Sequence, residues 1–497
     1  MADFDLAIIG GGINGVGIAR DAAGRGLKVL LVEQNDLASG TSSASTKLIH
    51  GGLRYLEHGA FRLVREALAE REVLLRIAPH LVRPIRIVLP PQNGPRSAFV
   101  IRMGLFVYDH LGGHTMLPKS KTVNLTHHAY GVPLQRHYTV GLEFSDCMSD
   151  DSRLVVLNAV DAAARGALIR TRTRCVRVER SELWTLVLNA RGRRNVATAR
   201  VLINAAGPWV GQLAETVLRL EGPLPLRLAQ GSHIVVRRLF DHSSGYMFQT
   251  ADARVVFALP FEQDFTLIGT TDNDFIGDVA TPIPSMQEIN YLCEAANMYF
   301  REPVRPVDVV WAFSGIRSLY DDGAVNADDV TRDYVLALDE GFRVAPLLTV
   351  YGGKITTYRR LAEAALTKLA HFFALGRAWT AQAPLPGGDF NPKDRESVIA
   401  DVARRWPFLS DNHARRLVSA YGTRVDRIID GAKSMDDLGV RFGVDLTAAE
   451  VRYLMREEWA ETPDDILWRR SKLALRLSRE DQEALSRFMV SSLGATG

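Results

Sequence analysis

Three glycines near the start of the chain are spaced for binding a nucleotide phosphate. They stand in Gly10-Gly-Gly12-Ile-Asn-Gly15, between an apolar, strand-like run and a helical segment. In such a unit Gly10 allows the tight turn, Gly12 lets a pyrophosphate approach the backbone, and Gly15 lets the helix pack on the sheet. The helix N-terminus offers free N–H groups to phosphates. Glu33, after a second apolar strand, can accept a hydrogen bond from a ribose 2′-OH. The spacing therefore predicts dinucleotide binding.

Two later segments favour FAD over NAD, because an NAD-binding domain needs only the first motif. Val201–Trp209 is an apolar strand that ends in small residues, as expected where backbone passes close to a flat or charged group. Val350–Tyr358 contains a strand, the pair Gly352-Gly353 and a predicted helix start. Free N–H groups there could face the pyrimidine oxygen of an isoalloxazine, where negative charge develops on reduction.

The bulk composition indicates a soluble multidomain protein. A chain of 497 residues is too long for one core. Apolar content of 47% and charged content of 24% are ordinary, and the net charge of +3 does not suggest a nucleic-acid partner. Three cysteines without C-x-x-C spacing fit a reducing compartment, and no metal site is expected. We expect no signal peptide, because acids stand where a basic region should be, and no apolar run long enough to span a membrane.

Charge is nevertheless uneven between Val73 and Leu142. This stretch contains eight basic residues but a single acidic residue, Asp109. An apolar run, Ala98–Val107, surrounds one of the basic residues, Arg102. The combination suits the surface of an anionic membrane. The alternative is a substrate-domain strand and loops with a solvated basic face, and the sequence leaves both open. The basic residues are Arg76, Arg83, Arg86, Arg96, Arg102, Lys119, Lys121 and Arg136.

The pattern along the chain predicts an α/β FAD-binding domain, an α+β substrate domain and a helical C-terminal domain. Helices are expected over 61–77 and 151–165, and strands over 233–236, 255–259, 265–268 and 347–351. After Pro386–Gly388 the composition turns helical. The predicted FAD-binding domain is 1–80 with 141–225 and 339–385, the substrate domain is 81–140 with 226–338, and the C-terminal domain is 386–497.

Several longer motifs resemble one family over essentially the full length of the chain. The most specific of them is Thr41-Ser-Ser-Ala-Ser-Thr-Lys-Leu-Ile-His-Gly-Gly-Leu-Arg-Tyr-Leu56. The others are Ile8–Gly15, Asn204-Ala-Ala-Gly-Pro-Trp209, Gln230-Gly-Ser-His233, Ile268-Gly-Thr-Thr-Asp272, Ser314-Gly-Ile-Arg317, Thr331-Arg-Asp333 and Tyr351-Gly-Gly-Lys-Ile-Thr-Thr-Tyr-Arg359. The chain is similar to the FAD-dependent, respiratory sn-glycerol-3-phosphate dehydrogenases of the bacterial membrane-associated type.

The resemblance implies a two-domain FAD-binding oxidoreductase fold with a Rossmann-like domain. The implied reaction oxidises glycerol 3-phosphate to dihydroxyacetone phosphate, with electrons passed to a membrane quinone. The implied protein is a homodimer, bound peripherally to an anionic lipid surface at the cytoplasmic face of the inner membrane.

This reaction needs a base, a cationic setting for the developing alkoxide and a clamp for a phosphate dianion. For the base we favour His233, because an imidazole titrates near working pH, and its position after Gly231-Ser232 is interpreted as the start of a strand. His50 is the competitor. Lys354 could hold the alkoxide or the reduced ring. Arginine suits the clamp because a guanidinium binds phosphate through two parallel hydrogen bonds. The predicted clamp and substrate residues are Arg54, Tyr55, Thr270, Arg317 and Arg332.

The predicted cofactor-binding residues belong to the same motifs. They are Gly10, Gly12, Asn14, Gly15, Glu33, Thr41, Ser42, Ser45, Lys47, His50, Gly51, Gly52, Ala206, Gly207, Trp209, Gly352, Gly353, Lys354 and Thr356.

Three other functions compete with this interpretation. An amine or D-amino-acid oxidase of the same fold would need a carboxylate clamp, usually one arginine with a tyrosine, whereas several cationic positions favour phosphate. A soluble glycerol-3-phosphate oxidase using O₂ is closer, and the apolar segment around Arg102 counts against it. A flavin-bearing RNA-binding protein would suit the pI of about 8.7, but no stacking motif or basic repeat is present.

Overall fold

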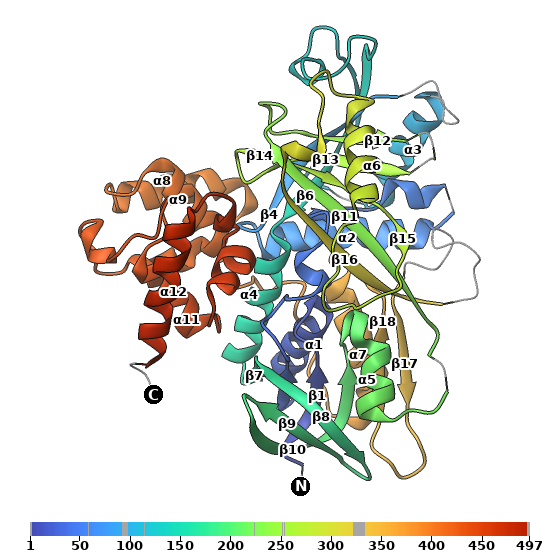
Figure 1. The fold of residues 1–497 in the computed structure, drawn as a ribbon. Coiled ribbons are helices and arrows are strands. Elements are labelled where there is room, and N and C mark those ends of the chain that lie inside the picture. Colours follow the sequence, from blue (N-terminus) through green and yellow to red (C-terminus); the bar gives the residue numbers. More distant parts are fainter. Residues whose placement is uncertain are drawn as a thin grey trace.

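The computed structural model describes residues 2–57, 59–91, 98–113, 115–222, 224–250, 252, 254–321 and 333–494. Two large sheets and a separate helical unit make up this part of the chain (Figure 1). The predicted substrate residue Arg332 lies outside the described residues.

The first sheet carries the nucleotide motif. Its strands lie in the order β17-β18-β10-β1-β2-β7, and all neighbours from β18 to β7 are parallel. The strands are β1 (Phe4–Ile9), β2 (Val29–Val32), β7 (Leu168–Arg170), β8 (Thr173–Arg180), β9 (Trp184–Ala190), β10 (Arg193–Asn204), β17 (Val335–Asp339) and β18 (Leu347–Tyr351). The central strands are buried, which explains their continuous apolar sequences.

Helices cover both faces of this sheet. One face is packed by α1 (Ile13–Gly24), α4 (Asp151–Ala164) and α7 (Tyr358–Lys368). The other face is covered by the β8–β9 hairpin together with α5 (Val210–Leu213) and η5 (Ala214–Leu218). The parallel order places the end of β1, the start of α1 and the end of β18 at one edge, where ligands of open α/β sheets bind.

The second sheet lies against that edge. Its order is β15-β11-β14-β13-β12-β4-β6-β3, with β16 on the other side of β11 and β5 on β6. The strands are β3 (Leu48–Ile49), β4 (Val82–Leu89), β5 (Lys121–Asn124), β6 (Val140–Ser149), β11 (Leu226–Arg237), β12 (Gly245–Gln249), β13 (Val255–Phe261), β14 (Phe265–Gly269), β15 (Asn273–Asp274) and β16 (Val309–Tyr320). Helices α2 (Phe61–Ile77), α3 (Ala98–Leu111) and α6 (Met286–Asn297) pack on it.

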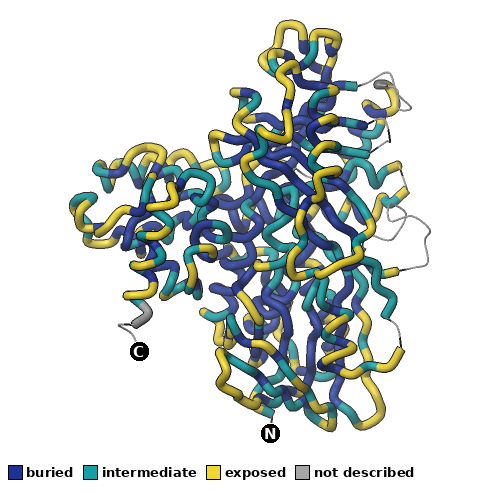
Figure 2. The backbone as a smooth tube through the Cα atoms, viewed as in Figure 1, coloured by how far each residue is buried: buried dark blue, intermediate teal, exposed yellow. Residues whose placement is uncertain are grey.

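The C-terminal part forms a helical unit with its own core, on one side of the two sheets (Figure 1). Its main elements are α8 (Arg395–Arg405), α9 (Asp411–Tyr421), α10 (Asp426–Ile429), α11 (Ala448–Glu457), η11 (Asp465–Arg470), η12 (Leu473–Leu475) and α12 (Arg479–Gly494). Buried ion pairs join it to the first sheet's domain, including Arg153 with Glu458 and Arg470 with Asp36. Buried backbone is continuous through the sheets and into this unit (Figure 2).

The predicted fold class is confirmed, and most predicted elements appear close to their expected positions. Helix α2 and strand β18 have the predicted bounds, and the chain after residue 388 is helical. The helix start predicted within Val350–Tyr358 is confirmed at Tyr358. Two local expectations are wrong. The apolar run 98–107 belongs to helix α3, not to the strand of the second alternative. Strand β11 begins at Leu226, so His233 lies inside it rather than at its start.

Sheet membership also departs from the predicted domain boundaries. Strand β6 pairs with β4 along its length and therefore belongs to the second sheet, although 141–149 was assigned to the FAD-binding domain. Strand β17 pairs with β18 in the first sheet, although 335–338 was assigned to the substrate domain. An apolar strand does not reveal which neighbour it pairs with. Among the described residues, no helix combines the length and the apolar character needed to cross a bilayer.

Candidate active site

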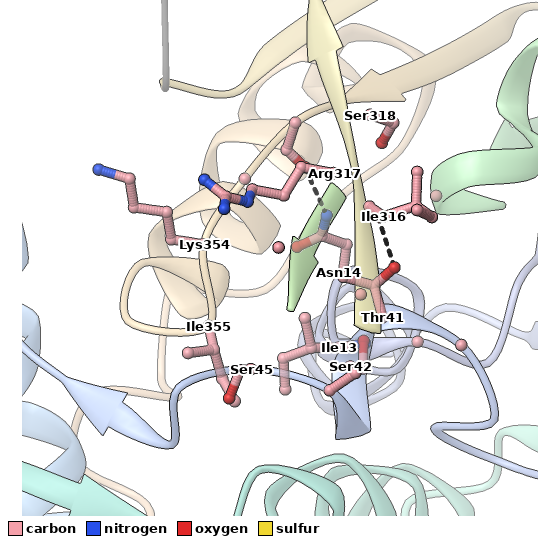
Figure 3. A pocket seen from close by; sticks show the side chains of 18 of the residues that line it. Ile13, Asn14, Thr41, Ser42, Ser45, Ile316, Arg317, Ser318, Lys354 and Ile355 are labelled. Carbon is pink, nitrogen blue, oxygen red and sulfur yellow. Dashed lines mark hydrogen bonds between the residues drawn. The ribbon is translucent and has the colours of Figure 1, made fainter. Parts of the chain in front are cut away.

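A large pocket opens between the two sheets and brings together segments that are far apart in sequence. Its wall includes the first glycine motif, the loop 39–56, the ends of β10 and β18, and the middle of β11 and β16. Figure 3 shows side chains from four of these segments around it. The pocket therefore has a nucleotide end on the first sheet and a substrate end on the second.

The nucleotide end is shaped by close backbone contacts. Gly10 has a φ of +121°, and a Cβ on it would lie 2.4 Å from the Ala205 carbonyl oxygen. A Cβ on Gly15 would lie 2.0 Å from the Gly10 carbonyl oxygen, so only glycine lets α1 start so near β1. Gly12 faces the pocket beside Ser42. Gly10 and Gly15 thus have the turn and packing roles that the spacing predicts, and the role of Gly12 toward a pyrophosphate stays a prediction.

Glu33 closes the nucleotide end. One carboxylate oxygen accepts the Gly11 N–H at 2.7 Å, and the other accepts the Asn35 N–H at 2.8 Å. Burial raises the pKa of this carboxyl. Each oxygen keeps a further lone pair, and the residue lines the pocket, so it can also accept a ribose hydroxyl.

Three polar side chains tie the walls of the pocket together. Ser42 Oγ accepts the Ile13 N–H at 3.0 Å, and Thr41 Oγ1 donates to the Ile316 carbonyl at 2.5 Å. Asn14 Nδ2 donates to the Gly352 carbonyl at 3.1 Å (Figure 3). The loop 39–46, the start of α1, β16 and the Gly352 turn are therefore fixed relative to one another.

The shape and donors of this end fit FAD. Gly352 and Gly353 both have positive φ, and a Cβ on Gly353 would lie 3.1 Å from Asn14 Nδ2. The start of α1 presents backbone N–H groups where a pyrophosphate is held in such folds. The small residues Ala205 to Gly207 leave room along the wall beside Trp209. The site thus offers a phosphate cradle, a ribose acceptor and a flat slot.

The substrate end is cationic. Arg317 on β16 lies 3.4 Å from an Asp272 carboxylate oxygen and donates to the Thr271 carbonyl at 3.4 Å. Lys354 Nζ lies 3.7 Å from the centroid of the Tyr55 ring. A Cβ on Gly231 would meet both Arg317 and Thr270, each at 2.7 Å, so this glycine makes room for the guanidinium. Arg54 also lines the pocket. An anion fits here.

His233 lies near Arg317 and is held by one side-chain hydrogen bond. Its Nε2 lies 2.9 Å from Thr46 Oγ1, and its ring stacks on Phe313 with centroids 5.0 Å apart. Nδ1 is buried and has no hydrogen-bond partner among the described residues. Burial lowers the pKa of His233 to about 3, with Lys47 and Arg317 adding repulsion. The imidazole is therefore neutral at physiological pH, the state in which it can accept a proton.

His50 occupies a different wall. Its backbone N–H faces Thr356 Oγ1 at 3.4 Å, and its ring meets the edge of Phe257. Burial lowers the pKa of His50 to about 4, with Lys354 and Arg71 adding to the shift. It is also neutral, so protonation state does not separate the two histidines.

Most residues predicted from sequence line the pocket, but three do not. Gly15 packs behind the first turn of α1, and the Gly51 N–H donates to Tyr108 Oη at 2.8 Å. Lys47 Nζ is buried on Asp151, 2.8 Å from a carboxylate oxygen. The predicted residues that line it are Gly10, Gly12, Asn14, Glu33, Thr41, Ser42, Ser45, His50, Gly52, Arg54, Tyr55, Ala206, Gly207, Trp209, His233, Thr270, Arg317, Gly352, Gly353, Lys354 and Thr356.

Sequence reasoning missed several polar residues of the pocket wall, among them Thr46, Asp146, Arg254 and Asp272. Thr46 bonds to His233 and Asp272 pairs with Arg317, and both stand inside motifs that were already recognised. Asp146 lines the pocket from β6, and burial raises the pKa of its carboxyl to about 6. No motif marks it; only its pairing with Arg71 and Tyr108 in the fold reveals it.

Comparison with known proteins gives the site its family. The family model "FAD dependent oxidoreductase" matches residues 5–359, and the model "C-terminal domain of alpha-glycerophosphate oxidase" matches residues 378–492. A glycerol-3-phosphate dehydrogenase of Pseudomonas aeruginosa is 51% identical over 491 residues, which cover 98% of this chain and 95% of the relative. The chain belongs to the FAD-dependent glycerol-3-phosphate dehydrogenase family.

Other relatives are similar to this protein over nearly the whole chain. An aerobic glycerol-3-phosphate dehydrogenase of Escherichia coli is 46% identical, covering 99% of this chain and 98% of the relative. A D-erythritol 1-phosphate dehydrogenase of Brucella abortus is 48% identical, covering 97% and 96%. The solved structure of a glycerol-3-phosphate dehydrogenase from Bacillus halodurans, complexed with FAD, has a TM-score of 0.79 and 26% identity, covering 99% of this chain and 91% of that one. FAD is therefore the cofactor of this member of the glycerol-3-phosphate dehydrogenase family.

Proposed function

We propose that this protein oxidises sn-glycerol 3-phosphate to dihydroxyacetone phosphate. The observation that carries the proposal is the substrate end of the pocket, whose wall holds Arg317, Lys354 and the neutral, buried His233. The names of the relatives at 46% and 51% identity support the same substrate. When bound, FAD supplies the hydride acceptor.

Each side chain then has a definite task. Arg317 presents a planar pair of donors to the phosphate. The imidazole of His233, which lines the pocket beside Thr46, accepts the proton of the C2 hydroxyl. The C2–H bond breaks with its electron pair leaving as hydride, and the carbonyl forms. Lys354 stabilises the negative charge that develops on the C2 oxygen.

The electrostatics make His233 a better base when substrate is present. Lys47 and Arg317 both lower its pKa in the free site. A phosphate dianion on Arg317 neutralises part of that repulsion, so the affinity of the imidazole for a proton rises on binding. The imidazole is therefore a stronger base with substrate bound than in the free site.

The flavin spectrum under anaerobic conditions tests the substrate. The purified protein should be yellow, and glycerol 3-phosphate should bleach it without oxygen. Glycerol, which lacks the phosphate, should leave the spectrum unchanged. Bleaching by D-alanine but not by glycerol 3-phosphate would replace this proposal with an amino-acid oxidase.

D-Erythritol 1-phosphate is the second candidate substrate, because a relative named for it is 48% identical over nearly the full chain. It carries the same phosphate and a neighbouring secondary alcohol, so Arg317 and His233 could treat both substrates alike. The ratio of the two bleaching rates, measured at equal subsaturating concentrations, decides between them. A ratio above one for the erythritol ester would make it the principal substrate.

We also propose that electrons pass to a membrane quinone and that α3 docks on the lipid. Four large apolar side chains of α3 are exposed: Phe99 (71%), Phe106 (58%), Val100 and Met103. Arg102 is exposed on the same helix. The charge argument is weaker than the sequence indicates, because Arg86 and Lys121 both pair with Glu143, just outside the basic stretch. Docking should therefore depend chiefly on apolar insertion into the headgroup boundary.

Vesicle flotation tests this surface. The variant with Phe99→Ser and Phe106→Ser should float less with anionic vesicles and reduce quinone more slowly, while anaerobic bleaching stays normal. Phe342→Ser is the matched control, because Phe342 is 89% exposed on the loop between β17 and β18, away from α3. If the α3 variant floats as well as the control, docking occurs elsewhere. The family resemblance also supports binding at the cytoplasmic face of the inner membrane and assembly as a homodimer. The molar mass measured by light scattering tests the homodimer.

A further inference from the structure

A row of four aromatic rings runs from the substrate end of the pocket into the C-terminal unit. His233 stacks on Phe313, with centroids 5.0 Å apart and an interplanar angle of 11°. Phe313 meets Trp311 at 4.4 Å, and Trp311 meets Trp468 at 4.5 Å. Each ring in the row is thus in contact with the next, from the proposed base to a residue of η11.

The sheet explains the first three rings. Strands β11 and β16 are antiparallel, with His233 opposite Phe313 and Val235 opposite Trp311. Phe313 and Trp311 are two residues apart, so they share one face of β16. Arg317 lies further along the same face, because positions of equal parity project to the same side. The face that presents the phosphate clamp therefore also supports the imidazole.

The fourth ring comes from outside both sheets. Trp468 lies on η11 of the C-terminal unit, and Leu475 of the same unit packs in the cluster that contains Phe313 and Trp311. This segment is anchored to the first domain by Lys472, whose Nζ donates to Ser152 Oγ at 2.8 Å. It is anchored to the second sheet by Arg476, which lies 2.8 Å from Asp264. Trp468 is therefore held in a fixed position against both parts of the pocket.

The ring of His233 is packed by both neighbouring strands: by Gly269 of β14, where a Cβ would lie 2.1 Å from His233 Cδ2, and by Phe313 of β16. The torsion between Cβ and the imidazole is broad in energy. Thr46 holds Nε2, and the buried Nδ1 has no protein partner among the described residues. The flat contact on Phe313 is the part of this packing that faces the ring plane, and Phe313 is backed by Trp311 and Trp468.

We propose that Trp468 is a positioning residue for His233: acting through Trp311 and Phe313, it aligns the imidazole for proton transfer, so that the C-terminal unit completes the active site. The inference rests on the proposed role of His233. It assigns a catalytic task to a domain that contributes no residue to the pocket wall described above.

Stopped-flow reduction of the holoenzyme by glycerol 3-phosphate tests the inference. Trp468→Ala should slow the limiting rate of flavin reduction on the order of tenfold, because a small misalignment of a reacting group is costly. The substrate concentration for half-maximal rate and the FAD content should change little, because Arg317 and the nucleotide end are untouched. Trp468→Phe restores a flat ring and should recover most of the rate. Trp468→Leu restores apolar volume without a flat face, so its limiting rate should stay low. This variant also replaces Trp468→Ala as the test if the alanine variant fails to fold.

Trp406→Ala is the matched control. Trp406 is another half-buried tryptophan of the C-terminal unit, and it packs on that unit's own core away from the row. Its truncation should lower thermal stability to a similar degree and leave the reduction rate within about twofold of wild type. Equal slowing by Trp406→Ala would mean that general loosening of the domain is responsible and would overturn the inference.

A double variant separates failure of this inference from failure of the proposed function. In the His233→Ala background, Trp468→Ala should have no further effect on the limiting rate, because residues that act through one another are not additive. A full additional loss would show that Trp468 acts elsewhere. If glycerol 3-phosphate bleaches no version of the protein, the proposed function fails first. If it bleaches wild type and Trp468→Ala equally fast, the inference alone fails.

Discussion

The two ends of the pocket are built in opposite ways. The nucleotide end is mostly backbone from a short stretch of chain: Gly10 to Gly15, with Glu33 returning to the Gly11 N–H. The substrate end is mostly side chains, with His233, Arg317 and Lys354 arriving from β11, β16 and the turn after β18. The first is centred on one strand–turn–helix unit, against which Ala205 and Ser42 pack. The second exists only when the two sheets are assembled.

This difference predicts how each end responds to substitution. A change at the nucleotide end should affect FAD retention and folding, because backbone packing is disturbed. A change at the substrate end should affect rate or substrate binding while FAD stays bound, because single side chains are exchanged on an intact scaffold. The following substitutions test that division.

The largest effect is expected from His233→Ala. Loss of a general base slows the chemical step by roughly 10²–10⁴-fold. FAD content and the spectrum of the oxidised protein should remain normal, since the nucleotide end does not involve His233. Stopped-flow reduction by glycerol 3-phosphate measures the rate. His413→Ala removes a histidine that is equally buried in the C-terminal unit and should leave the rate unchanged. A wild-type rate in His233→Ala would transfer the role to His50 or Lys354.

Arg317→Lys should weaken substrate binding more than it slows chemistry. Lysine keeps the charge but loses the planar pair of donors, which is worth about 1.5–3 kcal/mol for a hydrogen bond to a charged group. We expect kcat/KM to fall by about 10–100-fold, mainly through KM. Arg305→Lys is the control, because Arg305 pairs with Asp308 at an exposed site. An unchanged kcat/KM would show that Arg317 does not bind the phosphate. It would also contradict the expectation that side chains of the substrate end control substrate binding.

The same division explains what the sequence could predict. Helix α1, strands β1 and β2, and the roles of the glycines follow from spacing within one βαβ unit, because the physical constraints act between near neighbours. The family motifs contain most of the predicted residues that line the pocket. FAD and the fold class are confirmed by the match over residues 5–359.

What the sequence could not predict depends on partners far along the chain. Thr46 faces His233 only because loop 39–46 lies against β11 and β16. Lys47 is a cation in a pocket motif, but Asp151 at the start of α4 holds it behind the wall. The segment of helix α3 is also hard to recognise from sequence, because its apolar residues are not confined to one face: Ile101 and Leu105 are buried while Phe99 and Phe106 are exposed. An amphipathic period, the usual sign of a helix, is therefore weak there.

Gly15→Ala is expected to break the nucleotide end. The added Cβ would stand 2.0 Å from the Gly10 carbonyl oxygen, which belongs to the tight turn and cannot move without shifting β1. Overpacking of this kind costs about 1–3 kcal/mol of folding stability, and FAD should be lost on dilution. Gly104→Ala is the control, because a Cβ there meets nothing within 4 Å. Thermal unfolding and the bound flavin absorbance are the measurements, and a stable, yellow Gly15→Ala protein would contradict the packing argument.

The smallest effect is expected from Glu33→Gln, which keeps the shape of the side chain and removes its charge. The carboxylate accepts two backbone N–H groups, and both oxygens must act as acceptors. In glutamine one oxygen becomes an NH₂ group, which cannot accept, so either Gly11 or Asn35 loses its partner. The turn loosens and the ribose contact weakens, which should raise the Kd for FAD about tenfold, or about 1.4 kcal/mol.

The rate of flavin reduction at saturating FAD should stay at the wild-type value, because no group of the substrate end has moved. Titration of apoprotein with FAD gives the Kd, and stopped flow gives the rate. Glu179→Gln, at an exposed carboxylate on the outer hairpin of the same sheet, serves as the control for the charge change. If Glu33→Gln slows reduction even when FAD saturates the site, the two ends are mechanically coupled through the flavin. Local backbone architecture would then set the catalytic geometry as well as the affinity.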